Sequence, residues 1–295
     1  MAASSKSLAK VCVALGLTVG SIVLTPSCRA DQATLFIRQI QAPIPPDCTV
    51  KNDQNALSIG RGLLDTGLST RYLMNALIGN QMVARGDAKL ARSEPNRVIV
   101  KGADVHIFDD TQTEKAFYSV VATGVADPTS GSDPGYGIAQ FEVIPHSIGT
   151  SIANELRALV AAGKPASKTF EAHFKVFGTT LGGTDVESAE YIYPIDVCFG
   201  CTIQFPADAN DTTISGPPNC GGKVAAAASA SGVILACLPG QDGETDCRSC
   251  QGSPVCTPCG LASDLFPYST FPPDATCQSK HGAGSRCAVA VHHCI

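Results

Sequence analysis

The cysteines of this 295-residue chain are concentrated near its C-terminal end. Eleven of the fourteen fall between Cys198 and Cys294, and the stretch from Thr49 to Val197 contains none. Such a density is typical of chains that fold in an oxidising compartment, where disulfides replace part of a large hydrophobic core. The distribution therefore predicts two regions, the second of which is held together mainly by disulfides.

The N-terminus has the organisation of an export signal. Lys6 and Lys10 lie in a leading segment without acidic residues, and fourteen mostly apolar residues follow from Val11 to Leu24. A transmembrane helix needs about 20 apolar residues, so this run is too short to be a permanent anchor of that kind. We interpret residues 1–27 as a signal peptide.

The apolar run is followed by Thr25-Pro26-Ser27-Cys28. This ending resembles the lipobox of bacterial lipoprotein precursors, in which a small residue precedes a cysteine that is acylated. The resemblance implies that Cys28 is lipidated and that acyl chains hold the protein at a membrane surface. The alternative is cleavage after Ala30, which would give a soluble chain beginning at Asp31. Both routes predict an exported protein of the outer membrane or periplasm.

Both routes also leave an even number of cysteines for pairing. Cys12 is lost with the signal peptide, and Cys28 is either acylated or discarded. An even count favours a complete set of disulfides, although the sequence does not select their connectivity. The disulfide candidates are Cys48, Cys198, Cys201, Cys220, Cys237, Cys247, Cys250, Cys256, Cys259, Cys277, Cys287 and Cys294.

Residues 28–205 predict a mainly β domain, an antiparallel immunoglobulin-like β-sandwich. Short runs of extended character alternate with turn-forming residues. Alternation is clearest at Phe170, Ala172, Phe174 and Val176, which would share one buried face of a strand. The predicted strands cover residues 34–41, 57–64, 70–82, 97–108, 115–126, 136–144, 169–180 and 190–196.

One short helix is expected within this domain, over residues 150–162. Ile152, Leu156, Leu159 and Val160 recur at helical spacing, and Gly163 lies just beyond them. An amphipathic helix of this length usually covers the core of its own domain. We therefore expect it to cap an open end of the sandwich, in preference to docking a partner.

Residues 206–295 predict a loop-dominated region stapled by disulfides, which Cys48 would tie to the first region. Pairs of cysteines two residues apart occur at Cys198/Cys201, Cys247/Cys250 and Cys256/Cys259. Haem attachment would need His after the second cysteine, which none of them has.

A zinc site and a thiol-redox site remain as alternatives to structural disulfides. Zinc would use the thiolates of two pairs, although Cys250 and Cys256 are closer together than the about 15–20 residues of a zinc ribbon. For redox chemistry, Cys256-Thr-Pro-Cys259 is the best candidate of the three pairs, although the neighbouring prolines favour a loop over the helix that activates such a cysteine.

Charge and motif content exclude several functions. The formal net charge is −5 at pH 7 with no basic cluster, so nucleic-acid binding is not expected. The chain has no Gly-x-Ser-x-Gly elbow, phosphate loop or His-Glu-x-x-His pair. His106 and His173 fit a solvated face of a sheet, and His292 and His293 fit surface positions beside a disulfide at Cys294. We predict no catalytic residue, no metal ligand and no cofactor.

Three segments together resemble uncharacterised cysteine-rich predicted lipoproteins of Gram-negative bacteria. They are Tyr193-Pro-Ile-Asp-Val-Cys-Phe-Gly-Cys201, Cys237-Leu-Pro-Gly-Gln-Asp242 and Asp246-Cys-Arg-Ser-Cys250. The resemblance covers about the last third of the chain and the strand that leads into it. It implies export and a location in the cell envelope, and it carries no biochemical activity.

The sequence thus predicts an exported cell-envelope protein, lipid-anchored through Cys28, that serves as a binding or structural module with an unidentified protein partner. One alternative is a periplasmic thiol-redox or zinc-binding protein that uses a Cys-x-x-Cys pair. The other is a subunit of a surface assembly.

Overall fold

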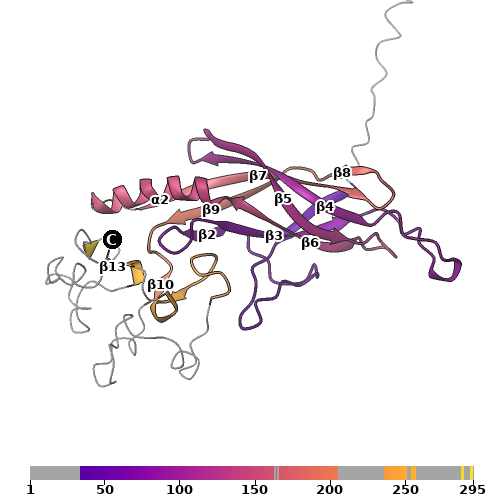
Figure 1. The fold of residues 1–295 in the computed structure, drawn as a ribbon, viewed down its shortest axis with the longest axis horizontal. Helices are drawn as coiled ribbons and strands as arrows, with labels where there is room; N and C mark the ends of the chain where they lie inside the picture. The colour runs from indigo at the N-terminus through magenta and orange to yellow at the C-terminus, as the bar shows by residue number, and fades with distance from the viewer. Residues whose placement is uncertain are drawn as a thin grey trace, which may run out of the picture. The chain divides into compact units, whose positions relative to one another are not determined.

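The computed structural model describes residues 34–162, 164, 166–204, 236–250, 254–256, 287–288 and 293–294. The described residues all belong to one compact unit. Most of its strands belong to one curled, mainly antiparallel sheet, in the order β1-β3-β6-β5-β4-β7-β9-β2, with β8 beside β7 (Figure 1). These strands are β1 Leu35–Ile40, β2 Gly62–Asp65, β3 Tyr72–Asn80, β4 Val98–Asp109, β5 Glu114–Ala126, β6 Gly135–Ile144, β7 Ser167–Thr180, β8 Asp185–Glu187 and β9 Tyr191–Cys198.

The sheet bends sharply between β5 and β6, which share a single ladder pair, Thr123 with Gln140. Glycines stand on both strands at this point. A Cβ on Gly124 would lie 2.2 Å from the carbonyl oxygen of Ile138, and one on Gly137 would lie 1.8 Å from that of Val125. Because no side chain fits there, the two strands can approach closely and the sheet can turn a corner.

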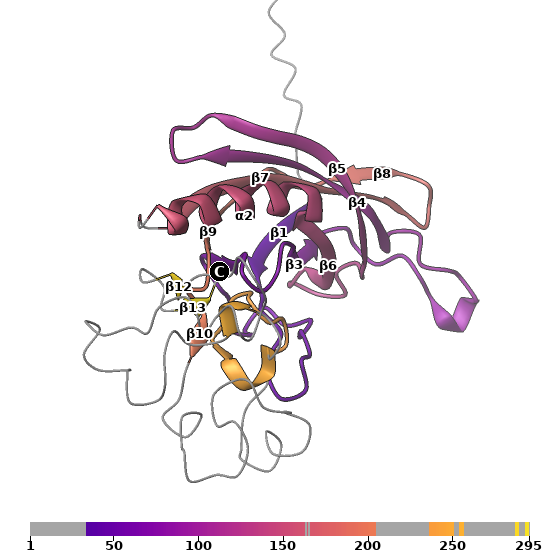
Figure 2. The ribbon, with the colours of Figure 1, turned by 60° about the vertical axis from the view of Figure 1, so that its left-hand side comes forward.

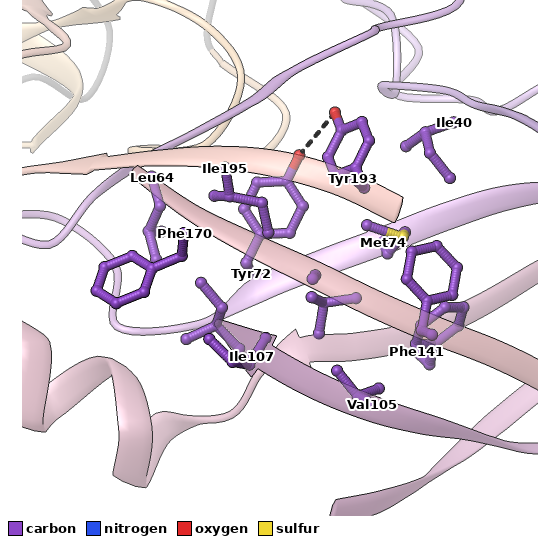
Figure 3. Packing of buried hydrophobic residues seen from close by; sticks show 14 of the residues in the cluster. Ile40, Leu64, Tyr72, Met74, Val105, Ile107, Phe141, Phe170, Tyr193 and Ile195 are labelled. Atoms are coloured by element: carbon purple, nitrogen blue, oxygen red, sulfur yellow. Dashed lines mark hydrogen bonds between the residues drawn. The ribbon is translucent and has the colours of Figure 1, made fainter. Parts of the chain in front are cut away.

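The bend brings the two halves of the sheet together around one hydrophobic core. Tyr72 and Met74 of β3 lie in the same cluster as Tyr193 of β9 and Val105 of β4 (Figure 3). The predicted face of β7 is confirmed, because Phe170, Ala172, Phe174 and Val176 are all buried. The mainly β character is therefore correct, and the immunoglobulin-like arrangement stays a prediction.

The expected helix is present as α2, His146–Ala161. It begins four residues earlier than the predicted 150, because Pro145 already has the extended backbone of a residue preceding a helix. Ile152, Leu156 and Val160 belong to the hydrophobic core. Figure 2 shows α2 beside β7 and β9.

The predicted strand at 57–64 is wrong over most of its length. Only the segment from Gly62 onward is a strand, β2, which pairs in parallel with β9. Leu57 is exposed and lies in a loop. The predicted set also lacked the short strand β8, which pairs with β7 after a tight turn.

Shorter elements lie outside the large sheet. Two of them, β10 and β11, pair in parallel across the expected boundary at residue 205, and the residues around 240 contact β2 and β3. The elements are η1 Ala88–Leu90, β10 Ile203–Gln204, β11 Thr245–Asp246, η3 Cys247–Cys250, η4 Pro254–Cys256, β12 Cys287–Ala288 and β13 His293–Cys294.

Candidate functional site

A disulfide turn lies where β2 and β9 end. These parallel strands pair Asp65 with Cys198, so their following loops meet at one edge of the sheet. Cys198 is bonded to Cys201. The two cysteines differ in exposure, because Cys198 is 4% exposed and Cys201 is an exposed residue. We call residues 198–202 the disulfide turn.

The carboxylate of Asp65 is the centre of the disulfide turn and is fully buried. Oδ1 accepts hydrogen bonds from the amides of Gly67 at 2.9 Å and Gly200 at 2.7 Å. Oδ2 accepts from the amide and the hydroxyl of Thr202, both at 2.9 Å. A carboxylate has about four lone-pair sites, so these four donors satisfy it and offset the cost of burying its charge.

Within the described residues, Asp65, Cys198 and Cys201 form a group of potential metal ligands, with one ligand atom of each within 4.8 Å of the others. The residues do not fit a zinc ion in this state. Both sulfurs are joined in a disulfide, and the carboxylate oxygens already accept four hydrogen bonds. Zinc requires thiolates and free oxygen lone pairs.

A second buried polar cluster lies close by, where the 236–246 segment meets the sheet. The hydroxyl of Tyr72 donates to the carboxylate of Asp242, 2.8 Å from each oxygen, and lies 3.4 Å from the hydroxyl of Tyr193 (Figure 3). The amide of Leu63 donates to Asp242 at 2.8 Å. Burial raises the pKa of Asp242, and it raises the pKa of Tyr72 well above its ordinary value.

A pocket of about 380 Å³ opens between α2, β7 and the turn that joins β4 to β5. We call it the α2 pocket. Ile107, Ile152 and Phe170 line it and belong to the hydrophobic core, so its floor is apolar. The remaining lining residues are Asp109, Asp110, Lys115, Ser147, Ile148, Ser151, Glu155, Lys168 and Thr169.

Both lysines at the α2 pocket are paired. The ammonium of Lys115 lies 2.7 Å from the carboxylate of Asp109, and that of Lys168 contacts Glu155. The hydrogen bond from Lys115 holds the pKa of Asp109 well below its usual range, and the same bond raises the pKa of Lys115. The rim therefore offers hydroxyl groups, two ion pairs and the carboxylate of Asp110.

The histidines expected on a sheet face lie side by side on neighbouring strands, where His106 of β4 pairs with His173 of β7. The ring of His106 stacks on Phe117 with centroids 4.3 Å apart, and the ring of His173 lies 4.6 Å from that of Phe108. The side chain of His173 is only 17% exposed, so its position is less solvated than expected. His292 lies outside the described residues.

The disulfide candidates fall into several groups. Cys48 is bonded to Cys237, which is the expected link between the first region and the later one.

Two of the expected Cys-x-x-Cys pairs are not formed. Cys256 is bonded to Cys250, which excludes both the Cys256/Cys259 pair, the best redox candidate, and the Cys247/Cys250 pair. Cys247 is also disulfide-bonded. The backbones of Cys287 and Cys294 pair between β12 and β13. The other disulfide candidates, Cys220, Cys259 and Cys277, lie outside the described residues, as does the predicted lipidation site Cys28.

Sequence reasoning missed the polar residues that organise both clusters. Asp65 lies in an ordinary Leu-Asp-Thr-Gly run, and its partners at Gly200 and Thr202 are more than a hundred positions away. Asp242 belongs to one of the three segments that carry the lipoprotein resemblance, and its sequence context predicts no role for it. The one available signal was a short polar run, Gln241-Asp242, directly after Pro239-Gly240 in a cysteine-rich region.

Comparison with known proteins adds no family. No family model matches the chain, and no curated protein matches it. A solved structure, the crystal structure of a protein from Archaeoglobus fulgidus, is similar at 12% identity with a TM-score of 0.25, covering 43% of this chain and 85% of that one. A likeness this weak supports no functional argument. In the part of the chain that the structure describes, every helix is too short or too polar to cross a membrane.

Proposed function

We propose that this chain is an exported cell-envelope protein that acts as a binding module, held at a membrane surface by acyl chains on Cys28. Export is supported by the leader sequence and by the disulfides in the described residues, which form in oxidising compartments. The lipid anchor rests on the lipobox-like ending at Ser27-Cys28. The proposal includes a location in the outer membrane or periplasm.

The proposal includes an immunoglobulin-like sandwich followed by a disulfide-rich C-terminal region. The two halves of the curled sheet, which share one core, support the sandwich. The Cys48–Cys237 and Cys250–Cys256 bonds support the stapled region.

The α2 pocket is the observation that carries the binding function. Ligand sites usually combine an apolar lining with a few polar groups that fix orientation, and a volume of about 380 Å³ falls in their range. Ile107, Ile152 and Phe170 would contact an apolar body, while Ser151 and Thr169 would orient polar groups. Since both lysines are paired and Asp110 adds a further negative charge, a small uncharged ligand fits better than an anion.

Native mass spectrometry tests the binding function on full-length protein purified from its own envelope. We expect a bound small molecule on the unmodified chain. Ser151→Trp should fill the α2 pocket and remove that molecule, whereas Asn154→Trp, on the same helix outside the lining, should retain it. Equal retention by both variants would place the ligand elsewhere, and absence of any bound species from the unmodified chain would contradict the binding function.

Fatty-acid labelling tests the anchor separately. The unmodified chain should incorporate a labelled acyl group and partition with detergent, and Cys28→Ser should do neither. A mature chain that begins at Asp31 without acyl mass would rule out the anchor and leave the α2 pocket proposal unaffected.

A further inference from the structure

We propose that the disulfide between Cys198 and Cys201 is a reversible redox couple that exchanges with an external dithiol, and that the sulfur of the exposed residue Cys201 is the one attacked. This activity goes beyond ligand binding, and its site lies at the C-terminal end of β9, at Cys198. It concerns a different Cys-x-x-Cys pair from the one that the sequence favoured.

The disulfide turn is held without help from the disulfide. Asp65 accepts hydrogen bonds from Gly200 and Thr202, on either side of Cys201. The amide and the hydroxyl of Thr66 both donate to the carbonyl oxygen of Cys198, at 2.8 and 2.7 Å. Because these bonds fix the backbone on both sides of the sulfurs, the oxidised and reduced forms can share one conformation. Little reorganisation then opposes exchange in either direction.

The disulfide is also a poor structural crosslink. It joins residues three positions apart, whereas the Cys48–Cys237 bond joins residues 189 positions apart. A crosslink restricts the unfolded chain more when the loop that it closes is longer. The long-range bond therefore provides the chain constraint, and the short one adds little that the Asp65 hydrogen bonds do not already provide.

The unequal exposure of the two cysteines gives the exchange a direction. Cys201 is an exposed residue and is the side from which a thiolate can approach, while Cys198 is buried. A thiolate of the dithiol attacks Sγ of Cys201, the bond between the two protein sulfurs breaks, and Cys198 leaves with the electron pair and takes a proton. The second thiol of the dithiol then attacks its own mixed disulfide and releases Cys201. The protein gains two electrons and two protons, and the dithiol becomes a disulfide.

The buried Asp65 also limits what else this site can hold. Its carboxylate lies within 4.8 Å of both sulfurs. The same four hydrogen bonds that hold Asp65 leave it no free lone pair for a metal ion.

The first experiment measures how fast each disulfide of the native full-length chain is reduced by dithiothreitol, using alkylation and mass spectrometry. The Cys250–Cys256 bond is the matched control, because it is also short-range and Cys256 is fully buried. We expect Cys198–Cys201 to be reduced at least tenfold faster, with the near-ultraviolet dichroism of the tyrosines unchanged, and to reform on adding oxidised dithiothreitol. Equal rates, or reduction only upon unfolding, would overturn the proposal.

Two single variants test the assignment of the attacked sulfur. In Cys198→Ser the remaining thiol at Cys201 should react with an aromatic disulfide reagent at least tenfold faster than the thiol at Cys198 does in Cys201→Ser. The dichroism of both variants reports whether each is folded. A reversed or equal order of rates in folded protein would assign the attack to Cys198 and overturn the direction of exchange.

Discussion

The side-chain amide of Gln241 pairs with the peptide group of Leu73 in both directions. Its Oε1 accepts from the amide of Leu73 at 2.9 Å, and its Nε2 donates to the carbonyl oxygen of Leu73 at 2.7 Å. Gln241 also forms a backbone bridge with Leu64 of β2. One residue from the C-terminal region thus connects β2 to β3, although neither strand pairs with the other in the sheet.

Replacing Gln241 should therefore weaken the domain. Gln241→Ala removes three side-chain hydrogen bonds, two with Leu73 and one to the carboxylate of Asp242, and leaves both polar groups of Leu73 without these partners. This should cost about 2 kcal/mol of unfolding free energy. Gln140→Ala is the control, because Gln140 is exposed and makes one side-chain bond, and its cost should stay within about 0.5 kcal/mol. Urea unfolding measures both, and equal losses would contradict the role of Gln241.

The packing of α2 makes a sharp prediction at Gly149. A Cβ there would lie 1.9 Å from the carbonyl oxygen of Thr70, so Gly149→Ala must displace either the helix or the turn. We expect a loss of about 2 kcal/mol, comparable with overpacking a core. Gly131→Ala is the control, since nothing lies within 4 Å of its Cβ position. Thermal unfolding of the two variants should separate them clearly, and a neutral Gly149→Ala would mean that α2 packs less closely.

The tyrosines predict a loss of stability at high pH. Burial raises the pKa of Tyr72, Tyr118, Tyr191 and Tyr193. A raised folded pKa means that the folded chain keeps protons that the unfolded chain has lost. Their contribution to stability is therefore complete below about pH 10 and declines as the pH rises further.

Tyrosinate absorbance during an alkaline titration checks this expectation. The native chain should show a delayed rise that coincides with the loss of near-ultraviolet dichroism, whereas the guanidinium-unfolded chain should titrate in one step near pH 10. Identical titrations of the folded and unfolded chains would contradict the burial of these hydroxyl groups.

The two disulfides should differ in their effect on stability. Loop-closure entropy predicts a contribution of about 5 kcal/mol for Cys48–Cys237 and about 2 kcal/mol for Cys198–Cys201. The double variant Cys48→Ser/Cys237→Ser should thus unfold at a much lower urea concentration than Cys198→Ser/Cys201→Ser. The opposite order would make the short disulfide structural and would also weaken the redox proposal.

Asp65 should be intolerant of amide substitution. In Asp65→Asn one carboxylate oxygen becomes an NH₂ group, which is a donor and would face the donors that now bond to that oxygen. We expect a loss of about 3 kcal/mol of unfolding free energy. Asp110→Asn, at an exposed position, is the matched control and should be nearly neutral. Urea unfolding distinguishes them, and a stable Asp65→Asn would show that the disulfide turn is held by other contacts.

Local pattern predicted most of the strands, because alternation such as that of Phe170 to Val176 reports burial directly. It failed at 57–61, where a hydrophobic residue, Leu57, lies exposed in a loop. The Asp65 cluster was beyond reach because its bonds join residues 135 and 137 positions apart. Nothing in the residues around Gln241 indicates which peptide group it will meet.

Gln241 and Cys237 have a consequence for the order in which the chain matures. During export the N-terminal strands emerge first, yet the residues that bridge β2 to β3, and the partner of Cys48, are separated from them by more than 160 positions. Until that segment arrives, the edge strand β2 and the Leu73 end of β3 lack their backbone and side-chain partners and are open to pairing with other chains. A prematurely terminated chain should therefore aggregate or be degraded instead of accumulating as a smaller folded domain.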